Sequence, residues 1–150
     1  MKGRTYRYFE GEPLWPFGFG LSYTTFSYSN LMLPDTPLSA GDPLHASVTV
    51  ANTGKVTGEE VVELYLKFPD VAGAPRLALR GFQRVHLEPG ASQKVEFQLN
   101  PRDLSMVTDL GDIIVPEGKY TVSIGGGQPG TEAPSITGNF DVKGQIMLPE

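Results

Sequence analysis

The sequence contains no cysteine among its 150 residues, so neither disulfide cross-links nor thiolate metal sites are available to it. It has no run of about eighteen apolar residues that would span a membrane. Residues 1–6 lack the apolar stretch of a signal peptide. Acidic residues outnumber basic ones, which gives a net charge of −5 at pH 7. Nucleic-acid binding requires a basic surface and is therefore not expected.

The sequence is rich in residues that favour turns, with 18 glycines and 13 prolines. They separate short segments in which apolar and polar residues alternate, as in strands with one buried face. A length of 150 residues fits one domain. Seven or eight strands without a long helix predict an all-β, immunoglobulin- or fibronectin type III-like sandwich of two sheets. The strand segments are 24–33, 44–51, 59–68, 76–87 (one or two strands), 95–99, 113–115, 120–124 and 140–142.

The chain divides into three parts. Residues 1–22 form an extended strap or linker, residues 23–143 the sandwich, and residues 144–150 a loose C-terminal tail. One turn of helix is expected over residues 101–105, because Asn100 suits the N-cap and Pro101 the first helical position. In the segment 76–87 the expected core residues are Leu77, Leu79, Phe82, Val85 and Leu87.

The strap combines large aromatic side chains with proline and glycine. Proline fixes its own backbone angle φ, and glycine permits the close approach of another segment. We therefore expect the strap to pack against the sandwich and against neighbouring domains. The aromatic residues are Trp15, Phe17, Phe19 and Tyr23, joined by Tyr6, Tyr8 and Phe9, and the glycines with a structural role are Gly18 and Gly20.

A second interpretation of the same aromatic residues is ligand binding. A row of exposed rings could bind plant-wall polysaccharide or lignin-like phenolics. The interleaved proline and glycine suit a wedged linker better than a flat binding platform, so docking is favoured. The aromatic and cationic segment 4–11 is interpreted either as a flexible arm or as a linker that a neighbouring domain orders. Exposure of the rings in the intact protein discriminates between docking and ligand binding.

The polar residues do not indicate a catalytic or metal site. Glu59, Glu60 and Glu63 are clustered, and alternation places Glu59 and Glu63 on a solvated outer face. His45 and His86 lie far apart in the sequence on polar faces, so neither a metal site nor a Ser-His-Asp site is indicated. The glycine-rich segments 18–20 and 125–127 precede no helix, which excludes a phosphate-binding loop. No catalytic residue, metal or cofactor is expected.

Tyr120 is a candidate structural residue. The segment 116–120, Pro-Glu-Gly-Lys-Tyr, fits a tyrosine corner, in which the tyrosine hydroxyl hydrogen-bonds the backbone a few residues upstream. An ordinary half-buried tyrosine explains the sequence equally well.

Several segments together resemble one known family. Residues 16–26, Pro-Phe-Gly-Phe-Gly-Leu-Ser-Tyr-Thr-Thr-Phe, resemble the junction that leads into the C-terminal fibronectin type III-like domain of glycoside hydrolase family 3 enzymes, the β-glucosidases, β-xylosidases and relatives. Residues 3–9 are similar to the segment that leaves the α/β domain of the xylosidase-type members. Met106 stands where relatives often carry an aromatic residue. The further similar segments, in the same order as in the family, are 50–54, 60–66, 79–85 and 116–120.

This resemblance implies a function for the parent protein rather than for the chain alone. The parent enzyme would be a retaining O-glycosyl hydrolase, periplasmic or secreted, with its catalytic aspartate and glutamate upstream of Met1. The chain would then be a fragment and a non-catalytic accessory domain. Its expected partners are the catalytic barrel and α/β domains, with neither nucleic acid nor membrane. The alternative is an autonomous module that binds plant-wall polysaccharide or lignin.

Overall fold

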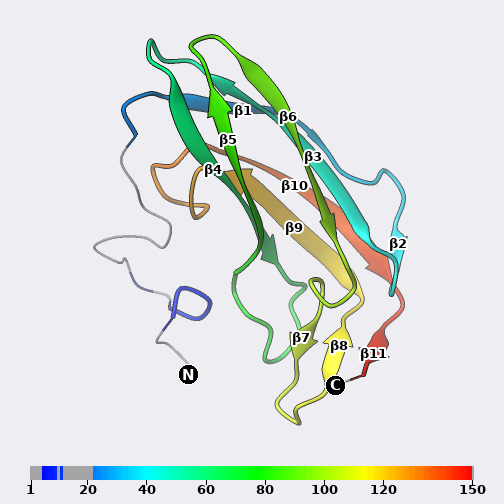
Figure 1. Ribbon diagram of the computed structural model, residues 1–150. Coiled ribbons are helices and arrows are strands. Elements are labelled where there is room, and N and C mark those ends of the chain that lie inside the picture. Colours follow the sequence, from blue (N-terminus) through cyan, green and yellow to red (C-terminus); the bar gives the residue numbers. More distant parts are fainter. Residues whose placement is uncertain (1–4, 10, 12–21, 150) are drawn as a thin grey trace.

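A computed structural model describes residues 5–9, 11 and 22–149 of the chain. The described residues form a short turn at residues 5–8, eleven strands and no helix, so the all-β prediction is confirmed (Figure 1). The strands are β1 (Phe26–Met32), β2 (Leu38–Ser39), β3 (Leu44–Asn52), β4 (Gly58–Lys67), β5 (Ala78–Leu87), β6 (Ser92–Leu99), β7 (Met106–Val107), β8 (Ile113–Val115), β9 (Gly118–Gly125), β10 (Ser135–Lys143) and β11 (Ile146–Leu148).

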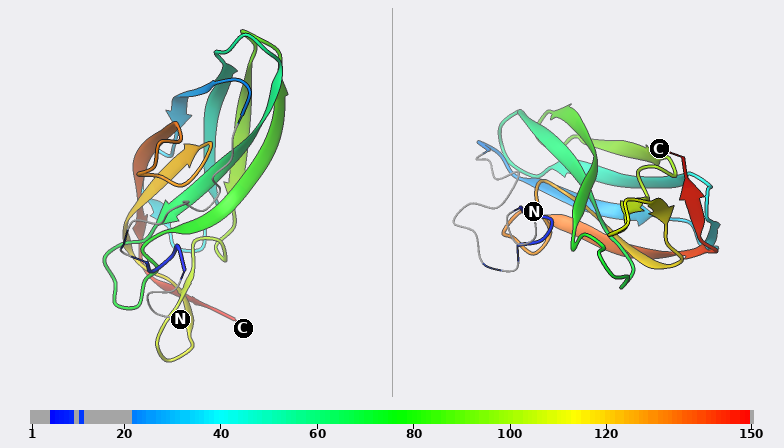
Figure 2. Two further views of the ribbon diagram at one scale, coloured as in Figure 1. Left: turned by 90° about the vertical axis from the view of Figure 1, so that its left-hand side faces the viewer. Right: turned by 90° about the horizontal axis from the view of Figure 1, so that it is seen from below.

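Two sheets make the body of the molecule. The first has the order β1-β3-β6 and the second the order β2-β10-β9-β4-β5. Among the described strands of these two sheets, the short strand β2 pairs in parallel with the end of β10. The other pairings are antiparallel. The sheets lie as two layers, and their edges approach where β1 lies beside β10 and β5 beside β6 (Figure 2). This arrangement is the predicted two-sheet sandwich.

A third, small sheet lies beyond one end of the sandwich, at the bottom of Figure 1. In it, β8 pairs with β7 on one side and with β11 on the other. The expected loose tail is therefore wrong for Ile146–Leu148, which form β11, with Ile146 and Leu148 half-buried against the core. Three residues are too few to show a strand period in the sequence.

The core lies between the inner faces of the two sheets. Every second residue of the long strands points into it, as alternation predicts. Its largest fully buried member is Tyr120, with no exposed surface. The predicted inward residues that are buried are Val62, Leu64, Leu66, Val85, Leu87, Val95, Phe97, Leu99, Val122, Ile124, Phe140 and Val142.

The prediction that Phe82 belongs to the core is wrong, because its side chain is 70% exposed. Val85 and Leu87 are buried, and alternation carries the inward face of β5 back to Gly81 rather than to Phe82. A Cβ atom at Gly81 would lie only 3.0 Å from Cδ1 of Phe97. Phe97 thus fills the space in front of Gly81, and Phe82 projects from the outer face.

The outer face of β4 is only partly solvated. Glu59 is exposed as predicted, and its carboxylate lies 3.3 Å from the guanidinium of Arg84. The prediction is wrong for Glu63, whose side chain is buried and accepts a 2.7 Å hydrogen bond from the hydroxyl of Tyr65. Tyr65 is itself fully buried. Something besides the two sheets must therefore cover this part of β4.

The predicted helical turn at residues 101–105 is a hydrogen-bonded turn instead. The backbone N–H of Leu104 donates to the carbonyls of both Asn100 and Pro101, at 3.3 and 3.1 Å. The carboxylate of Asp103 accepts from the N–H of Asn100 at 2.8 Å. The bond from the Asn100 N–H to Asp103 is one half of a capping box, but the chain leaves the turn for β7 before a helix can propagate.

Tyr120 makes the tyrosine-corner hydrogen bond. Its hydroxyl donates to the carbonyl of Pro116 at 2.9 Å and lies 3.4 Å from that of Leu104. Its ring stacks on Phe140, with centroids 5.1 Å apart, and lies 5.7 Å from the ring of Phe68. The residue joins β9 to the turn before β7 and explains how a buried hydroxyl is satisfied.

Asn52, at the end of β3, is a second polar anchor and is 1% exposed. Its amide nitrogen donates to the carbonyls of Val56 and Leu87, both at 2.9 Å. Its amide oxygen accepts from the hydroxyl of Thr24 at 2.7 Å and from the N–H of Gly54 at 3.0 Å. This one side chain therefore holds together the start of β1, the β3–β4 turn and the end of β5.

Candidate domain-docking surface

The N-terminal turn at residues 5–8 is attached to the beginning of β5. The hydroxyl of Tyr6 accepts a hydrogen bond from the backbone N–H of Leu79 at 3.1 Å. The carbonyl of Arg7 accepts from the N–H of Arg76 at 2.9 Å. Strand β5 is an edge strand, and such edges carry unpaired backbone donors and acceptors. The turn therefore accepts from one backbone donor of this edge strand and from one donor just before the strand begins.

The same turn covers the outer face of β4. The ring of Tyr6 meets the ring of Tyr65 edge-on, with centroids 6.3 Å apart. This edge-to-face geometry is favourable for aromatic pairs. Tyr65 donates in turn to Glu63. Burial and the hydrogen bond to Glu63 both raise the pKa of the Tyr65 hydroxyl, so it stays protonated and remains a donor.

Two exposed apolar side chains continue this face along β4 and β5. Phe82 stands opposite Glu63 and is 70% exposed, and Val61 stands opposite Arg84 and is 42% exposed. Alternation places all four outer residues on the same side of the sheet as Tyr65. The outer face of β4 and β5 thus runs from a covered end at Tyr65 to an uncovered end, where Phe82 and Val61 adjoin the exposed Arg84–Glu59 ion pair.

The predicted aromatic residues are distributed unevenly over the described part of the chain. Tyr6 and Tyr8 are half-buried, Phe9 is 39% exposed and Tyr23 is fully exposed. Trp15, Phe17, Phe19, Gly18 and Gly20 lie outside the described residues. Their docking or ligand-binding role stays a prediction. Sequence reasoning missed Phe82 as a surface residue, although counting Gly81 as an inward position would have found it.

Two arginines in this region lie over aromatic rings. One terminal nitrogen of Arg80 donates to the carbonyl of Ser105 at 2.8 Å, and the guanidinium lies 5.4 Å from the ring centroid of Phe68. Burial lowers the pKa of Arg80, and the neighbouring charge of Arg7 lowers it further. The guanidinium of Arg7 lies 6.0 Å from the ring centroid of Tyr6.

A polar bridge joins the two sheets at another place. The hydroxyl of Tyr28, in β1, donates to the carboxylate of Glu60, in β4, at 2.6 Å. Burial raises the pKa of Glu60, a rise that the Tyr28 hydrogen bond opposes. Gly126 leaves no room for a side chain, since a Cβ there would collide with the Glu60 carboxylate. Glu60 is thus held between the sheets and does not face solvent freely.

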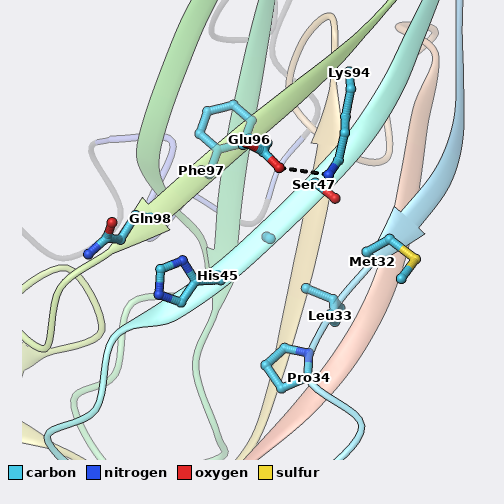
Figure 3. A pocket seen from close by; sticks show the side chains of 10 residues that line it. Met32, Leu33, Pro34, His45, Ser47, Lys94, Glu96, Phe97 and Gln98 are labelled. Carbon is cyan, nitrogen blue, oxygen red and sulfur yellow. Dashed lines mark hydrogen bonds and ion pairs between the residues drawn. The ribbon is translucent and has the colours of Figure 1, made fainter.

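A groove of about 620 Å³ lies on the outer face of the first sheet (Figure 3). Strands β3 and β6 form its floor and the end of β1 one wall. The groove contains an ion pair between Lys94 and Glu96, at 2.7 Å, in which both side chains are exposed. Such exposed pairs contribute little to stability. His45 lies in the groove and His86 on β5, both exposed as predicted. The groove is lined by Met32, Leu33, Pro34, His45, Ala46, Ser47, Lys94, Glu96, Phe97 and Gln98.

Comparison with known proteins identifies the family. Residues 60–128 match the family model of the fibronectin type III-like domain. Over 123 residues the chain is 44% identical to a β-xylosidase of Formosa agariphila, a match that covers 80% of the chain and 17% of the xylosidase. It is 42% identical to a probable β-glucosidase G of Aspergillus oryzae, covering 80% of the chain and 18% of that protein. The chain belongs to the fibronectin type III-like domains of glycoside hydrolase family 3.

The solved structures support the same assignment. The fibronectin type III-like domain superimposes on β-glucosidase 3B from Thermotoga neapolitana with a TM-score of 0.83 and 32% sequence identity. The match covers 95% of this chain and 19% of that one. A β-glucosidase from Kluyveromyces marxianus gives a TM-score of 0.79 at 34% identity. The chain spans less than a fifth of the length of these relatives.

Glu60 and Glu63, two of the clustered acidic residues, do not face one common site. Glu60 points between the sheets and Glu63 points from the outer face, so the sheet separates the two carboxylates. Within the part of the chain that the structure describes, no group of three or more histidine, aspartate or glutamate side chains could hold a metal ion. The same residues include no helix long and apolar enough to cross a membrane.

Proposed function

We propose that the chain is a non-catalytic accessory domain of a family 3 glycoside hydrolase and that it packs against the catalytic barrel and α/β domains of that enzyme. The relatives named β-xylosidase and β-glucosidase support this, because the chain corresponds to only 16–20% of their length. The parent enzyme would be a retaining O-glycosyl hydrolase that acts in the periplasm or outside the cell.

The packing role is inferred from the exposed apolar side chains on the outer face of β4 and β5. Phe82 is 70% exposed in β5, so a domain that covered it would remove its ring from water. Exposed apolar side chains beside one another are typical of interaction surfaces. Phe82 and Val61 continue the face on which Tyr6 already covers Tyr65. The segment that precedes the sandwich and a neighbouring domain would share this surface.

The separation of Glu60 and Glu63 supports a non-catalytic role. A retaining glycosidase needs two carboxyl groups roughly 5 Å apart on the two sides of the scissile bond. Here one carboxylate is bound to Tyr28 between the sheets, and the other is bound to Tyr65 under the N-terminal turn. Neither is placed to reach a sugar together with the other.

Two assays on the purified chain test this proposal. The first follows nitrophenol release from aryl β-glucosides and β-xylosides, where we expect none above a buffer blank. Turnover that co-purifies with the chain through two chromatographic steps would overturn the non-catalytic role. The second measures retention on insoluble cellulose, xylan and lignin. We expect no retention. Retention that is lost in Tyr23→Ala or Trp15→Ala would instead favour an autonomous binding module.

A further inference from the structure

The groove on the outer face of the first sheet lies beside a bulge in β1. Ser29 of β1 pairs with Thr49 of β3. The next pair is Met32 with Ser47, so β1 has one residue more than β3 between the two pairs. Within this bulge Asn30 has a φ of 53°, in the left-handed region. Bulges bend a strand and redirect its side chains, and here Met32 lies in the wall of the groove (Figure 3).

The strand register gathers polar side chains on the floor of the groove. Directly opposite residues of paired strands carry their side chains on the same face of the sheet. Met32, Ser47 and Glu96 therefore form one row across β1, β3 and β6. His45 and Gln98 form a second row, two residues further along β3 and β6. Figure 3 shows Met32 on one side of Ser47 and Glu96 on the other.

Ser47 is the buried polar side chain of the groove. It is only 8% exposed, and its hydroxyl has no hydrogen-bond partner among the described residues. Buried polar groups are normally hydrogen-bonded. His45 and Gln98 line the groove beside it, and they too make no side-chain hydrogen bond within the described part of the chain. Three side chains that can each donate and accept therefore face the groove without using that capacity inside the chain.

The rest of the lining favours an uncharged ligand. Lys94 and Glu96 form an ion pair at 2.7 Å, so their two charges neutralise each other. Met32 and Pro34 present apolar surface along one wall. A ligand that suits this lining directs hydroxyl groups to the floor and C–H groups to the wall. Carbohydrates combine these two kinds of surface in one molecule.

We propose that this groove binds a short, uncharged, soluble oligosaccharide. Hydroxyl groups of the sugar exchange hydrogen bonds with Ser47, His45 and Gln98, and its C–H groups contact Met32 and Pro34. Ligand sites are concave and combine apolar surface with a few polar groups, and a volume of about 620 Å³ is in their usual range. The groove lies on a different sheet from β4 and β5, so the inference does not rest on the proposed packing function.

The affinity of this site should be low. Phe97, the aromatic residue of the lining, is buried in the core, so its ring is not available to stack on a sugar. We expect a dissociation constant of about 1–10 mM. Binding this weak is lost during washing, so the expectation of no retention on insoluble polymers is unchanged.

The site is tested on the isolated chain by NMR. Backbone amide signals of the ¹⁵N-labelled chain are followed during titration with xylotriose and, separately, with cellotriose. With at least one of them we expect saturable shifts confined to β3, β6 and the end of β1, and a difference between them identifies the preferred sugar. Absence of saturable shifts up to about 50 mM of either would overturn the site. Trigalacturonate at constant ionic strength should bind more weakly, and equal or tighter binding would overturn the choice of an uncharged ligand.

Variants locate the binding in the groove. Ser47→Ala and Gln98→Ala should each weaken binding about fivefold, the effect of one lost hydrogen bond. Gln98 is exposed, so Gln98→Ala keeps the test decisive even where Ser47→Ala does not fold. Gln93→Ala is the matched control, because Gln93 lies on the same strand and on its opposite face, and it should bind within about twofold of the wild type. Equal weakening in Gln93→Ala, or wild-type affinity in the groove variants, would overturn the site.

Discussion

The hydroxyl of Tyr6 accepts a hydrogen bond from the backbone N–H of Leu79, 73 residues further along the chain. This bond, with that between Arg7 and Arg76, fixes the N-terminal turn on the edge of β5. A segment that precedes the sandwich in the sequence therefore packs on the edge strand β5 and covers Tyr65. The outer face of β4 and β5 is thus partly covered by the turn at residues 5–8.

Tyr6→Phe keeps the ring on Tyr65 and removes the acceptor for Leu79. We expect the free energy of unfolding to fall by about 1 kcal/mol, the usual net contribution of one hydrogen bond. Urea denaturation measures this, and amide exchange at Leu79 should become faster. Tyr8→Phe is the matched control, because its hydroxyl has no hydrogen-bond partner among the described residues. Equal stabilities of the two variants would show that the bond does not matter.

Asn52→Ala should strongly lower the free energy of unfolding, because Asn52 is buried and hydrogen-bonded. It removes four hydrogen bonds and leaves the buried carbonyl of Leu87 without its side-chain donor. We expect a loss of about 3 kcal/mol in urea denaturation. Asn139→Ala, which loses one exposed bond to Thr121, should stay within about 0.5 kcal/mol. A small effect at Asn52 would mean that water replaces the amide.

Glu60 should make stability depend on pH. Burial raises its pKa above the ordinary 4.5, so the folded chain holds this proton more tightly than the unfolded chain does. The free energy of unfolding is therefore expected to decrease as the pH rises from the ordinary pKa through the raised one. Glu60→Gln should remove that decrease, and the exposed Glu59→Gln should keep it. The measurement is urea denaturation at a series of pH values, and an unchanged pH profile in Glu60→Gln would contradict the prediction.

Gly81 should tolerate no larger side chain while Phe97 is present. Gly81→Leu would force the new side chain into the Phe97 ring, and overpacking of this kind costs about 1–3 kcal/mol. In a double-mutant cycle, Phe97→Ala should make room for it, so the double variant should be less destabilised than the sum of the two single variants. Strict additivity in urea denaturation would show that the two positions do not share this space.

The alternation of apolar and polar residues was enough to predict the long strands and most of the core. It failed at Phe82 because the inward residue beside it, Gly81, has no side chain and so leaves no apolar signal. It failed at Glu63 and Tyr65 because the cover over them comes from Tyr6, far away in the sequence. Periodicity reports on a strand's own faces and cannot show what another segment brings to them.

The buried side chains that hydrogen-bond other segments could be predicted from the sequence to different degrees. Tyr120 could be predicted because its turn carries a local signature, Pro-Glu-Gly-Lys-Tyr, and the bond to Pro116 spans only four residues. Asn52 looked like an ordinary turn residue, since its partners Thr24 and Leu87 are 28 and 35 residues away. The hydrogen bond between Tyr6 and Leu79 was equally hidden, because the two residues are 73 positions apart in the chain.

The proposed packing role requires the outer face of β4 and β5 to contact the catalytic domains. Calorimetric titration of the chain into the separately expressed catalytic part of the parent enzyme tests it most directly. We expect Phe82→Ser to weaken binding at least about tenfold, as loss of a buried aromatic contact does. Val107→Ser, 60% exposed on the small sheet, should change binding by no more than about twofold. Wild-type affinity in Phe82→Ser would contradict packing through this face.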